Sequence, residues 1–238
     1  MMRLTRRQFL TVSGATVLSL SLPWRTAAEV ARIPVLMYHD ISVQLTELET
    51  IMPSVFASQM EWLYAMGYHA ISFEELDSFD VDSAKRSLII TFDDGYVSFI
   101  DYVFPLLAEY RFKATVNIIG NEVGSVLSGH QQMFSWDECR YLLQSGLVDI
   151  GCHTHGLHVW GGWSSPTTAI TPFNERLKKD LATFQENCNK ELGRPVNILA
   201  WPYGMYDQRS IEIAQGEGFR YLLTSNRGYL EKNGDRSA

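Results

Sequence analysis

Short runs of apolar and β-branched residues alternate along the chain with segments whose apolar residues recur at helical spacing. Seven of these runs predict strands: Pro34–His39, His69–Ser72, Ser87–Asp93, Lys113–Ile119, Val148–His153, Val196–Pro202 and Tyr221–Ser225. A βα unit repeated in this way predicts an α/β fold with mostly parallel strands and helices outside the sheet. The simplest such arrangement is a distorted (β/α)7 barrel, closed or nearly closed.

The segments between the strands carry helix signals. Two of them place apolar residues on one helical face each: Phe56, Met60 and Leu63 in the first, and Leu177, Leu181, Phe184 and Cys188 in the second. Ser135 and Glu138 form a capping box that predicts the start of a third helix, which Gly146 ends. A short helix is expected to begin at Pro105 after a break at Phe104.

Polar residues with useful chemistry follow the apolar part of four predicted strands. They are His39-Asp40, Asp93-Asp94, His153-Thr154-His155 and Tyr203. In a parallel α/β barrel the carboxyl ends of all strands meet on one face, where active sites are built. The sequence therefore predicts an active site at the C-terminal strand ends.

Two adjacent carboxylates, Asp93 and Asp94, follow the apolar strand Ile89–Phe92. Successive residues of a strand point to opposite sides, so the two carboxylates are not equivalent. One of them can bind a metal ion while the other stays free as a general base. The alternative interpretation is a plain turn, because Asp-Asp-Gly is also favourable turn chemistry.

Three of the six histidines lie within His153–His158. Imidazole suits Zn²⁺ and related ions, and two histidines with one carboxylate leave a fourth position open for water, as a catalytic site requires. The spacing does not decide which two of His153, His155 and His158 would bind the ion. The alternative interpretation is a loop of solvated histidines.

The charge balance narrows the class of partner. The chain has 20 Lys and Arg against 27 Asp and Glu, and four of the arginines lie in the first 28 residues. Without that segment, 16 positive charges face 27 negative ones. Nucleic acids and anionic membrane surfaces both need clustered Lys and Arg, so neither is an expected partner.

Residues 1–28 are predicted to be an export signal, and residues 29–238 the folded domain. The first segment resembles a twin-arginine signal, with Arg6-Arg7 before an apolar run from Phe9 to Leu22 and a small-x-small cleavage site at Thr26–Ala28. The run is shorter than the ~20 apolar residues of a membrane span. The expected location is therefore periplasmic or extracellular, with no membrane span after signal removal. An uncleaved amphipathic start is the alternative.

The three cysteines, Cys139, Cys152 and Cys188, contain no C-x-x-C pair. They indicate neither a disulfide framework nor a cysteine zinc site. We expect them to be small buried hydrophobic residues.

Three motifs together resemble the polysaccharide deacetylases, carbohydrate esterase family 4. They are Thr-Phe-Asp-Asp-Gly-Tyr at Thr91–Tyr96, the histidine motif at His153–His158, and Trp-Pro-Tyr-Gly at Trp201–Gly204. The segment Met37–Asp40 resembles the branch that deacetylates poly-β-1,6-N-acetylglucosamine of biofilm exopolysaccharides. The resemblance covers roughly residues 33 to 226.

This resemblance implies a role for several residues. Asp93 would be the general base, and Asp94, His153 and His158 would hold one divalent metal ion. The backbone N–H of Tyr203 would help to form the oxyanion hole. The ion expected is Zn²⁺, with Co²⁺, Ni²⁺ or Fe²⁺ as alternatives. The reaction implied is the hydrolytic removal of N-acetyl groups from a polysaccharide.

The sequence departs from the pattern of most family members in two ways. No histidine follows His158, so their late Leu-x-His motif is missing. In the biofilm-type branch the fold order is permuted and the N-terminal strand supplies the acid, which implies that His39 takes this role. A histidine satisfied by backbone carbonyls is the alternative. No arginine precedes the Trp201–Tyr203 strand at a reliable position for holding the base, and Arg194 is a candidate for this role.

Four residues near the motifs are candidates for binding sugar rings: Trp160, Trp163, Trp201 and Pro202. Core packing is the default interpretation for each tryptophan. The oligomeric state is left open by the sequence.

Three other functions share part of this pattern. A deacetylase of chitin-type or peptidoglycan glycans would carry the same motifs. A binuclear hydrolase of the metallo-β-lactamase type would need Asp at the position of Leu157 and further histidines downstream, and there are none. A non-catalytic glycan-binding relative would keep the fold without the chemistry, whereas Asp93 and the metal-binding motif are intact here.

Overall fold

The computed structural model describes residues 32–44, 49–78, 86–126, 132–158, 173–226 and 228–231. The predicted export signal at 1–28 lies outside these residues, as do Trp160 and Trp163. None of the helices in the described ranges combines the length and the apolarity needed to cross a bilayer.

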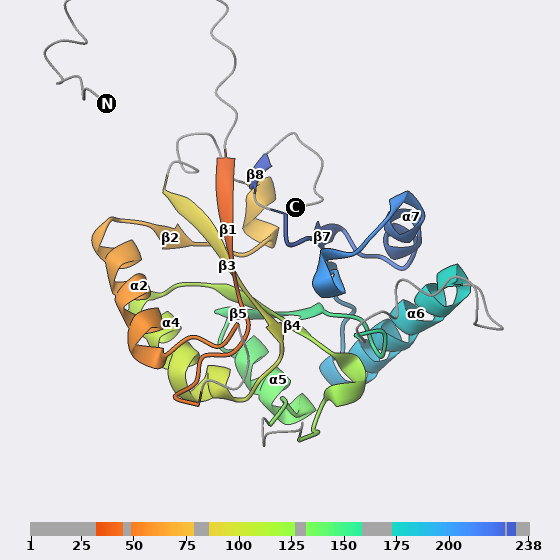
Figure 1. Ribbon diagram of the computed structural model, residues 1–238, viewed down its shortest axis with the longest axis horizontal. Coiled ribbons are helices and arrows are strands. Elements are labelled where there is room, and N and C mark those ends of the chain that lie inside the picture. Colours follow the sequence, from red (N-terminus) through yellow and green to blue (C-terminus); the bar gives the residue numbers. More distant parts are fainter. Residues whose placement is uncertain are drawn as a thin grey trace, which may run out of the picture.

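The main element is a curled, mostly parallel sheet with helices on its outside (Figure 1). Its strands are β1 Arg32–Tyr38, β2 His69–Ala70, β3 Ser87–Asp94, β4 Ala114–Ile118, β5 Val148–Cys152, β6 Ile198–Ala200, β7 Tyr221–Leu223 and β8 Tyr229–Glu231. The hydrogen-bonded path runs β7-β6-β5-β4-β3-β1-β8, and β2 pairs with the start of β3. The α/β barrel-like fold with mostly parallel strands is therefore confirmed.

All seven predicted strands are present, and each observed boundary lies within two residues of the predicted one. The eighth strand, β8, was not predicted. It pairs antiparallel with the first three residues of β1, and Arg32 is the partner of Glu231. Since β7 and β8 are the two ends of the path, the described strands curl into a half-barrel rather than a fully hydrogen-bonded ring.

The helices pack against the outer face of the sheet (Figure 1). They are α2 Pro53–Ala65, α4 Phe104–Tyr110, α5 Trp136–Gln144, α6 Phe173–Leu192 and α7 Gln208–Gly216, with short turns η1 Glu74–Asp77, η2 Phe99–Val103, η3 Gly120–Glu122 and η4 Pro202–Gly204. The predicted apolar faces of α2 and α6 are buried. The capping box at Ser135 and the left-handed Gly146 bound α5 as predicted.

One helix boundary differs from the prediction. The helix expected to begin at Pro105 after a break begins instead at Phe104. It follows directly on the π-helical turn Phe99–Val103. Proline is tolerated there because Pro105 lies in the first turn of α4, where its missing N–H costs no helical hydrogen bond.

The core has two parts, one on each face of the sheet. The larger part lies between the sheet and the helices. The smaller part is built from strand residues and the segment around η1, and includes Ile33, Ile89, Ile198, Tyr221 and Leu230. Side chains alternate along a strand, so Ile89 identifies the inward face of β3. Thr91 and Asp93 lie two and four positions after Ile89 and therefore face inward too. Ile33 identifies the inward face of β1 in the same way, so Met37 and His39 also face inward.

Candidate active site

A cleft of about 850 Å³ opens at the C-terminal ends of the strands. The six predicted catalytic and metal-binding residues line it together: His39, Asp93, Asp94, His153, His158 and Tyr203. They come from the ends of β1, β3 and β5 and from η4. The structure thus brings together residues that are up to 164 positions apart in sequence, as the predicted rim of a parallel sheet requires.

The register of β1 and β3 places His39 beside Asp93. The two strands are parallel, and Tyr38 is the Cα partner of Phe92, so the next residues along the two chains are His39 and Asp93. Both have inward parity, and both line the cleft. His39 is half-buried, whereas Asp93 is 5% exposed.

Asp93 is held by a residue that the sequence did not single out. Asn117 on β4 is the Cα partner of Asp93, and its side-chain amide donates a 2.8 Å hydrogen bond to Asp93 Oδ1. Gly151 on β5 is in turn the partner of Asn117. A Cβ at Gly151 would lie 2.1 Å from Asn117 Oδ1, so glycine is needed there to make room for the amide.

Arg194 does not hold the base. Its guanidinium lies 3.2 Å from Asp149 Oδ1, near the start of β5 and therefore toward the opposite end of the strands from the cleft. The candidate assignment of Arg194 was wrong. Arg194 precedes β6 and so lies at the N-terminal end of the parallel strands, whereas Asp93 lies at their C-terminal end. Asn117 takes the place beside Asp93 instead.

Asp94 reaches the cleft through an unusual backbone conformation. As the residue after the inward-facing Asp93, it would face the helices if the strand continued regularly. Its φ of 72° is left-handed, and Gly95 follows with φ 94°. A Cβ at Gly95 would lie 2.9 Å from Ile118 Cγ2, so the turn also needs glycine for space. This turn lets both carboxylates line the same cleft.

Asp94, His153 and His158 form a compact group of ligand atoms. Their nearest oxygen and nitrogen atoms all lie within 4.8 Å of one another. The distances from Asp94 Oδ1 are 3.6 Å to His153 Nε2 and 3.5 Å to His158 Nε2. Ligand atoms 2.0–2.2 Å from a tetrahedral ion are separated by roughly 3.3–3.6 Å, which matches this spacing better than a hydrogen bond would.

The electrostatics of these three residues also suit a cation. Asp94 Oδ1 is buried and has no hydrogen-bond partner among the described residues. His153 Nδ1 lies 2.9 Å from the carbonyl oxygen of Ala200, so the Nδ1–H tautomer leaves a lone pair on Nε2. Burial, reinforced by the neighbouring His153, lowers the pKa of His158 and favours its neutral form, although Asp94 acts in the opposite direction. The residues present therefore fit a divalent metal ion.

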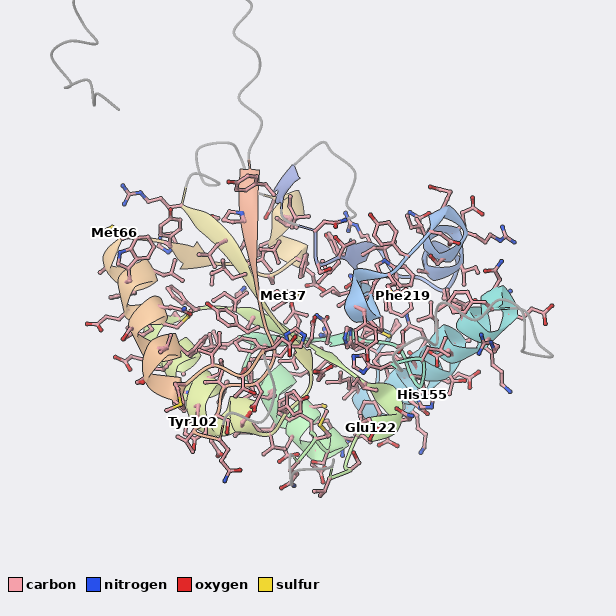
Figure 2. The ribbon with its side chains drawn as sticks, in the orientation of Figure 1. Met37, Met66, Tyr102, Glu122, His155 and Phe219 are labelled. Carbon is pink, nitrogen blue, oxygen red and sulfur yellow. The ribbon has the colours of Figure 1, made fainter. Side chains whose placement is uncertain are left out.

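The middle histidine of the motif lies apart from this group. His155 Nδ1 is buried against Gly120, where an added Cβ would come within 2.5 Å of it. Figure 2 shows His155 near α6, away from Met37, which lines the cleft together with His153 and His158. The structure thus separates His155 from His153 and His158, whereas the spacing of the motif did not decide which two of the three histidines would lie together.

Tyr203 lies in a strained turn at the cleft. Its φ is 58° and that of the next residue, Gly204, is 65°. A Cβ at Gly204 would lie 2.1 Å from Ser225 Oγ. The Tyr203 ring stacks on His158 with a centroid separation of 5.0 Å, and the side chain is 40% exposed. The turn therefore places Tyr203 directly over one of the three candidate ligands.

The predicted sugar-binding residues are only partly placed. Trp201 lines the cleft but is 3% exposed and stacks on Tyr206, so it offers little surface for a sugar ring. Pro202 is buried at the start of η4. Trp160 and Trp163 lie outside the described residues. Tyr206 and Tyr229, which were not singled out, line the cleft and are 39% and 59% exposed.

Residues 80–222 match the family model described as polysaccharide deacetylase. This chain belongs to that family. The match covers the strands β3 to β6, and with them Asp93, Asp94, His153, His158 and Tyr203. It leaves out His39, so the assignment to the polysaccharide deacetylase family does not depend on the N-terminal strand.

Several curated proteins are relatives of this polysaccharide deacetylase domain, and two of them illustrate the similarity. A putative polysaccharide deacetylase, YxkH, from Bacillus subtilis is 24% identical over 217 residues, covering 88% of this chain and 70% of that protein. A poly-β-1,6-N-acetyl-D-glucosamine N-deacetylase from Staphylococcus epidermidis is 28% identical over 171 residues. That alignment covers 71% of this chain and 59% of the relative, so part of the relative has no counterpart in it.

Among solved structures, IcaB from Ammonifex degensii is similar in fold to this polysaccharide deacetylase domain. It superposes with a TM-score of 0.73 at 26% identity, over 83% of this chain and 85% of that one. The structural similarity extends beyond the family-model match, because the superposition covers 83% of this chain whereas the match covers 143 of its 238 residues.

Proposed function

We propose that this protein is a metal-dependent hydrolase that removes N-acetyl groups from an N-acetylglucosamine polymer. The observation that carries the proposal is the convergence of two functional units in one cleft. Asp93 is held by Asn117, while Asp94 lies with His153 and His158 in a group that fits a cation. An acetamide is hydrolysed when a base activates water and a Lewis acid polarises the carbonyl, and this cleft provides residues for both.

Asp94, His153 and His158 would hold the ion. A divalent ion bound there would supply Lewis acidity next to Asp93, at a position left open by three protein ligands. Zn²⁺ suits a donor set of two imidazoles and one carboxylate, and Co²⁺, Ni²⁺ or Fe²⁺ suit it too.

Asp93 would act as the general base. It is not needed as a member of the cation group, and its Oδ1 accepts the hydrogen bond from Asn117, so Oδ2 is the oxygen available to take a proton from the attacking water. A base must lie within hydrogen-bond reach of the proton that it removes, and a fixed carboxylate satisfies this requirement without reorganisation.

His39 would protonate the departing amine. Its place beside Asp93 is set by the β1–β3 register, and an amine leaves an acetamide only when it is protonated.

The left-handed turn at Tyr203 would aim its backbone N–H at the oxyanion that forms on the acetamide carbonyl.

The charge of the cleft supports an amine product. Its described lining contains four carboxylates, those of Asp40, Glu49, Asp93 and Asp94, and no Lys or Arg. Each turnover would convert a neutral acetamido sugar into a cationic amino sugar. An anionic glycan would find no positive side chain in the described wall of this cleft.

For the substrate we propose poly-β-1,6-N-acetylglucosamine, which is supported by the similarity to the poly-β-1,6-N-acetyl-D-glucosamine N-deacetylase of Staphylococcus epidermidis. We further propose that residues 1–28 direct export by the twin-arginine route and that 29–238 form the catalytic domain. The partner is then a polysaccharide outside the cytoplasm.

The test is acetate release from β-1,6- and β-1,4-linked N-acetylglucosamine oligomers by protein loaded with Zn²⁺, Co²⁺ or Ni²⁺. We expect release from the β-1,6 oligomers, loss on chelation, and a rate lower by roughly 10²–10⁴ in Asp93→Asn, which keeps the metal. Faster release from the β-1,4 oligomers would assign a chitin-type substrate. Oligomer binding without any acetate release would assign a glycan-binding function.

A further inference from the structure

Asp180 on α6 reaches the loop between the two histidines of the cation group. Its Oδ2 accepts a hydrogen bond from the backbone N–H of His155, and its Oδ1 accepts one from that of Gly156, both at 2.7 Å. One carboxylate thus binds two successive backbone donors, with one oxygen for each. Hydrogen bonds to an ionised carboxylate are stronger than those between neutral groups.

The same loop contains a strained residue. Thr154 has φ 69° and is fully buried. A left-handed conformation is unfavourable for any residue with a Cβ, and for a β-branched residue it is rare. Such conformations persist only where the surroundings fix them. The loop therefore needs contacts that hold it in this shape.

Those contacts come from two sides. The N–H groups of Gly120 and Asn121 in η3 donate to the carbonyl oxygens of Thr154 and His155, at 3.0 and 2.8 Å. Asp180 binds the N–H groups on the other side. The loop must bring His158 back to face His153. The centroids of the two imidazole rings lie 4.8 Å apart.

We propose that Asp180 is a positioning residue for the metal site, which fixes the 154–157 loop so that His158 can bind the same ion as Asp94 and His153. The inference rests on the metal site of the proposed function. Asp180 itself is not one of the three clustered residues. It acts through the backbone of the loop.

Packing of the helix does not depend on this carboxylate. Leu177, Leu181, Phe184 and Cys188 of α6 are all fully buried and attach the helix to the sheet. Removing the carboxylate should therefore release the loop while α6 stays in place. An asparagine at this position keeps the size of the side chain but offers one acceptor oxygen, and its NH₂ group would oppose the second N–H.

The experiment compares Asp180→Asn with Asp149→Asn in the full chain. Asp149 is a suitable control because it is also a partly buried carboxylate with a polar partner, Arg194, but lies at the other end of β5. Zn²⁺ affinity is measured by competition with a chromophoric chelator, and the Co²⁺ absorption spectrum reports ligand geometry. The melting temperature and amide hydrogen exchange are measured on the metal-free chains.

We expect Asp180→Asn to weaken Zn²⁺ binding by about 10- to 100-fold and to alter the Co²⁺ spectrum. Exchange at the amides of His155 and Gly156 should become faster, while the metal-free melting temperature falls no further than in Asp149→Asn. Unchanged affinity and spectrum in Asp180→Asn, with binding lost in His158→Ala, would overturn the positioning role alone. Unchanged binding in His158→Ala would overturn the metal site and this inference with it.

Discussion

The side-chain amide of Asn117 donates a 2.8 Å hydrogen bond to Asp93 Oδ1, and the two residues are direct partners across β3 and β4. Asn117 is fully buried, and Gly151 leaves the space that its side chain occupies. The carboxylate of Asp93 is thus oriented by a neutral donor from the adjacent strand.

Replacing this donor should lower turnover while the metal stays bound. We expect Asn117→Ala to reduce kcat by roughly 10- to 100-fold, because a base that is free to rotate is less often in its productive orientation. The loss of the buried hydrogen bond should also cost about 1–3 kcal/mol of stability. Kinetics of acetate release and thermal unfolding measure the two effects.

Thr115→Val is the matched control for Asn117→Ala. Thr115 lies two residues earlier on the same face of β4, is buried, and has a hydroxyl without a hydrogen-bond partner among the described residues. Its replacement should leave kcat within about threefold, since no contact to Asp93 is removed. Full activity in metal-loaded Asn117→Ala would show that Asp93 needs no orienting partner.

The histidine motif yields a prediction about metal content. His158→Ala should lose both metal and activity, because Nε2 of His158 lies 3.5 Å from the buried Asp94 Oδ1. His155→Ala should keep the metal, since His155 packs beside Gly120 and is not one of the three clustered residues. Elemental analysis after dialysis measures the metal content of both variants. Retention of metal by His158→Ala with loss by His155→Ala would reverse the assignment.

His39 should matter most when the leaving group needs a proton. We expect His39→Ala to lose most activity on an N-acetyl sugar, by roughly 10²–10⁴, and much less on an activated aryl acetate, whose phenolate departs unprotonated. The two rates are measured on the same metal-loaded preparation. Equal losses on both substrates would assign His39 to positioning or to structure.

The three thiols should be unreactive in the folded protein. Burial raises the pKa of Cys139 and of Cys188 to about 12, and raises that of Cys152 as well. Because the thiolate is the reactive form, a thiol reagent at pH 8 should label none of them rapidly until denaturant is added, and then all three. Rapid labelling of one thiol in the native state would contradict this prediction.

The sequence predicted the parts of the fold that depend on local pattern. The predicted strands are short apolar or β-branched runs, four of them followed by polar residues of the cleft, and both helices with a clear apolar face pack as expected. The strand β8 escaped prediction because Tyr229–Glu231 is not part of a longer apolar run, and its pairing with β1 is a contact between distant parts of the chain.

The sequence predicted which polar residues gather in the cleft, but not the residues that hold them in place. Asp93, Asp94 and the histidines follow strands in recognisable motifs, whereas Asn117 and Asp180 act through contacts 24 and 25 residues away in sequence. The one available signal for Asn117 was a polar residue within a buried strand, a position that normally demands a partner. The left-handed Asp94, Thr154 and Tyr203 could not be foreseen, because they are not glycines.

The strands β1 and β8 pair like the two strands of a β-hairpin, but no turn connects Glu231 to Arg32. Arg32 and Glu231 are partners at its end, and partners in an antiparallel pair lie about 5 Å apart, which a two-residue turn can bridge. A circular permutant could therefore join Glu231 to Arg32 and open new ends in another connection. His39 would remain beside Asp93, because that contact depends on which strands are neighbours in the sheet and not on their order in the gene.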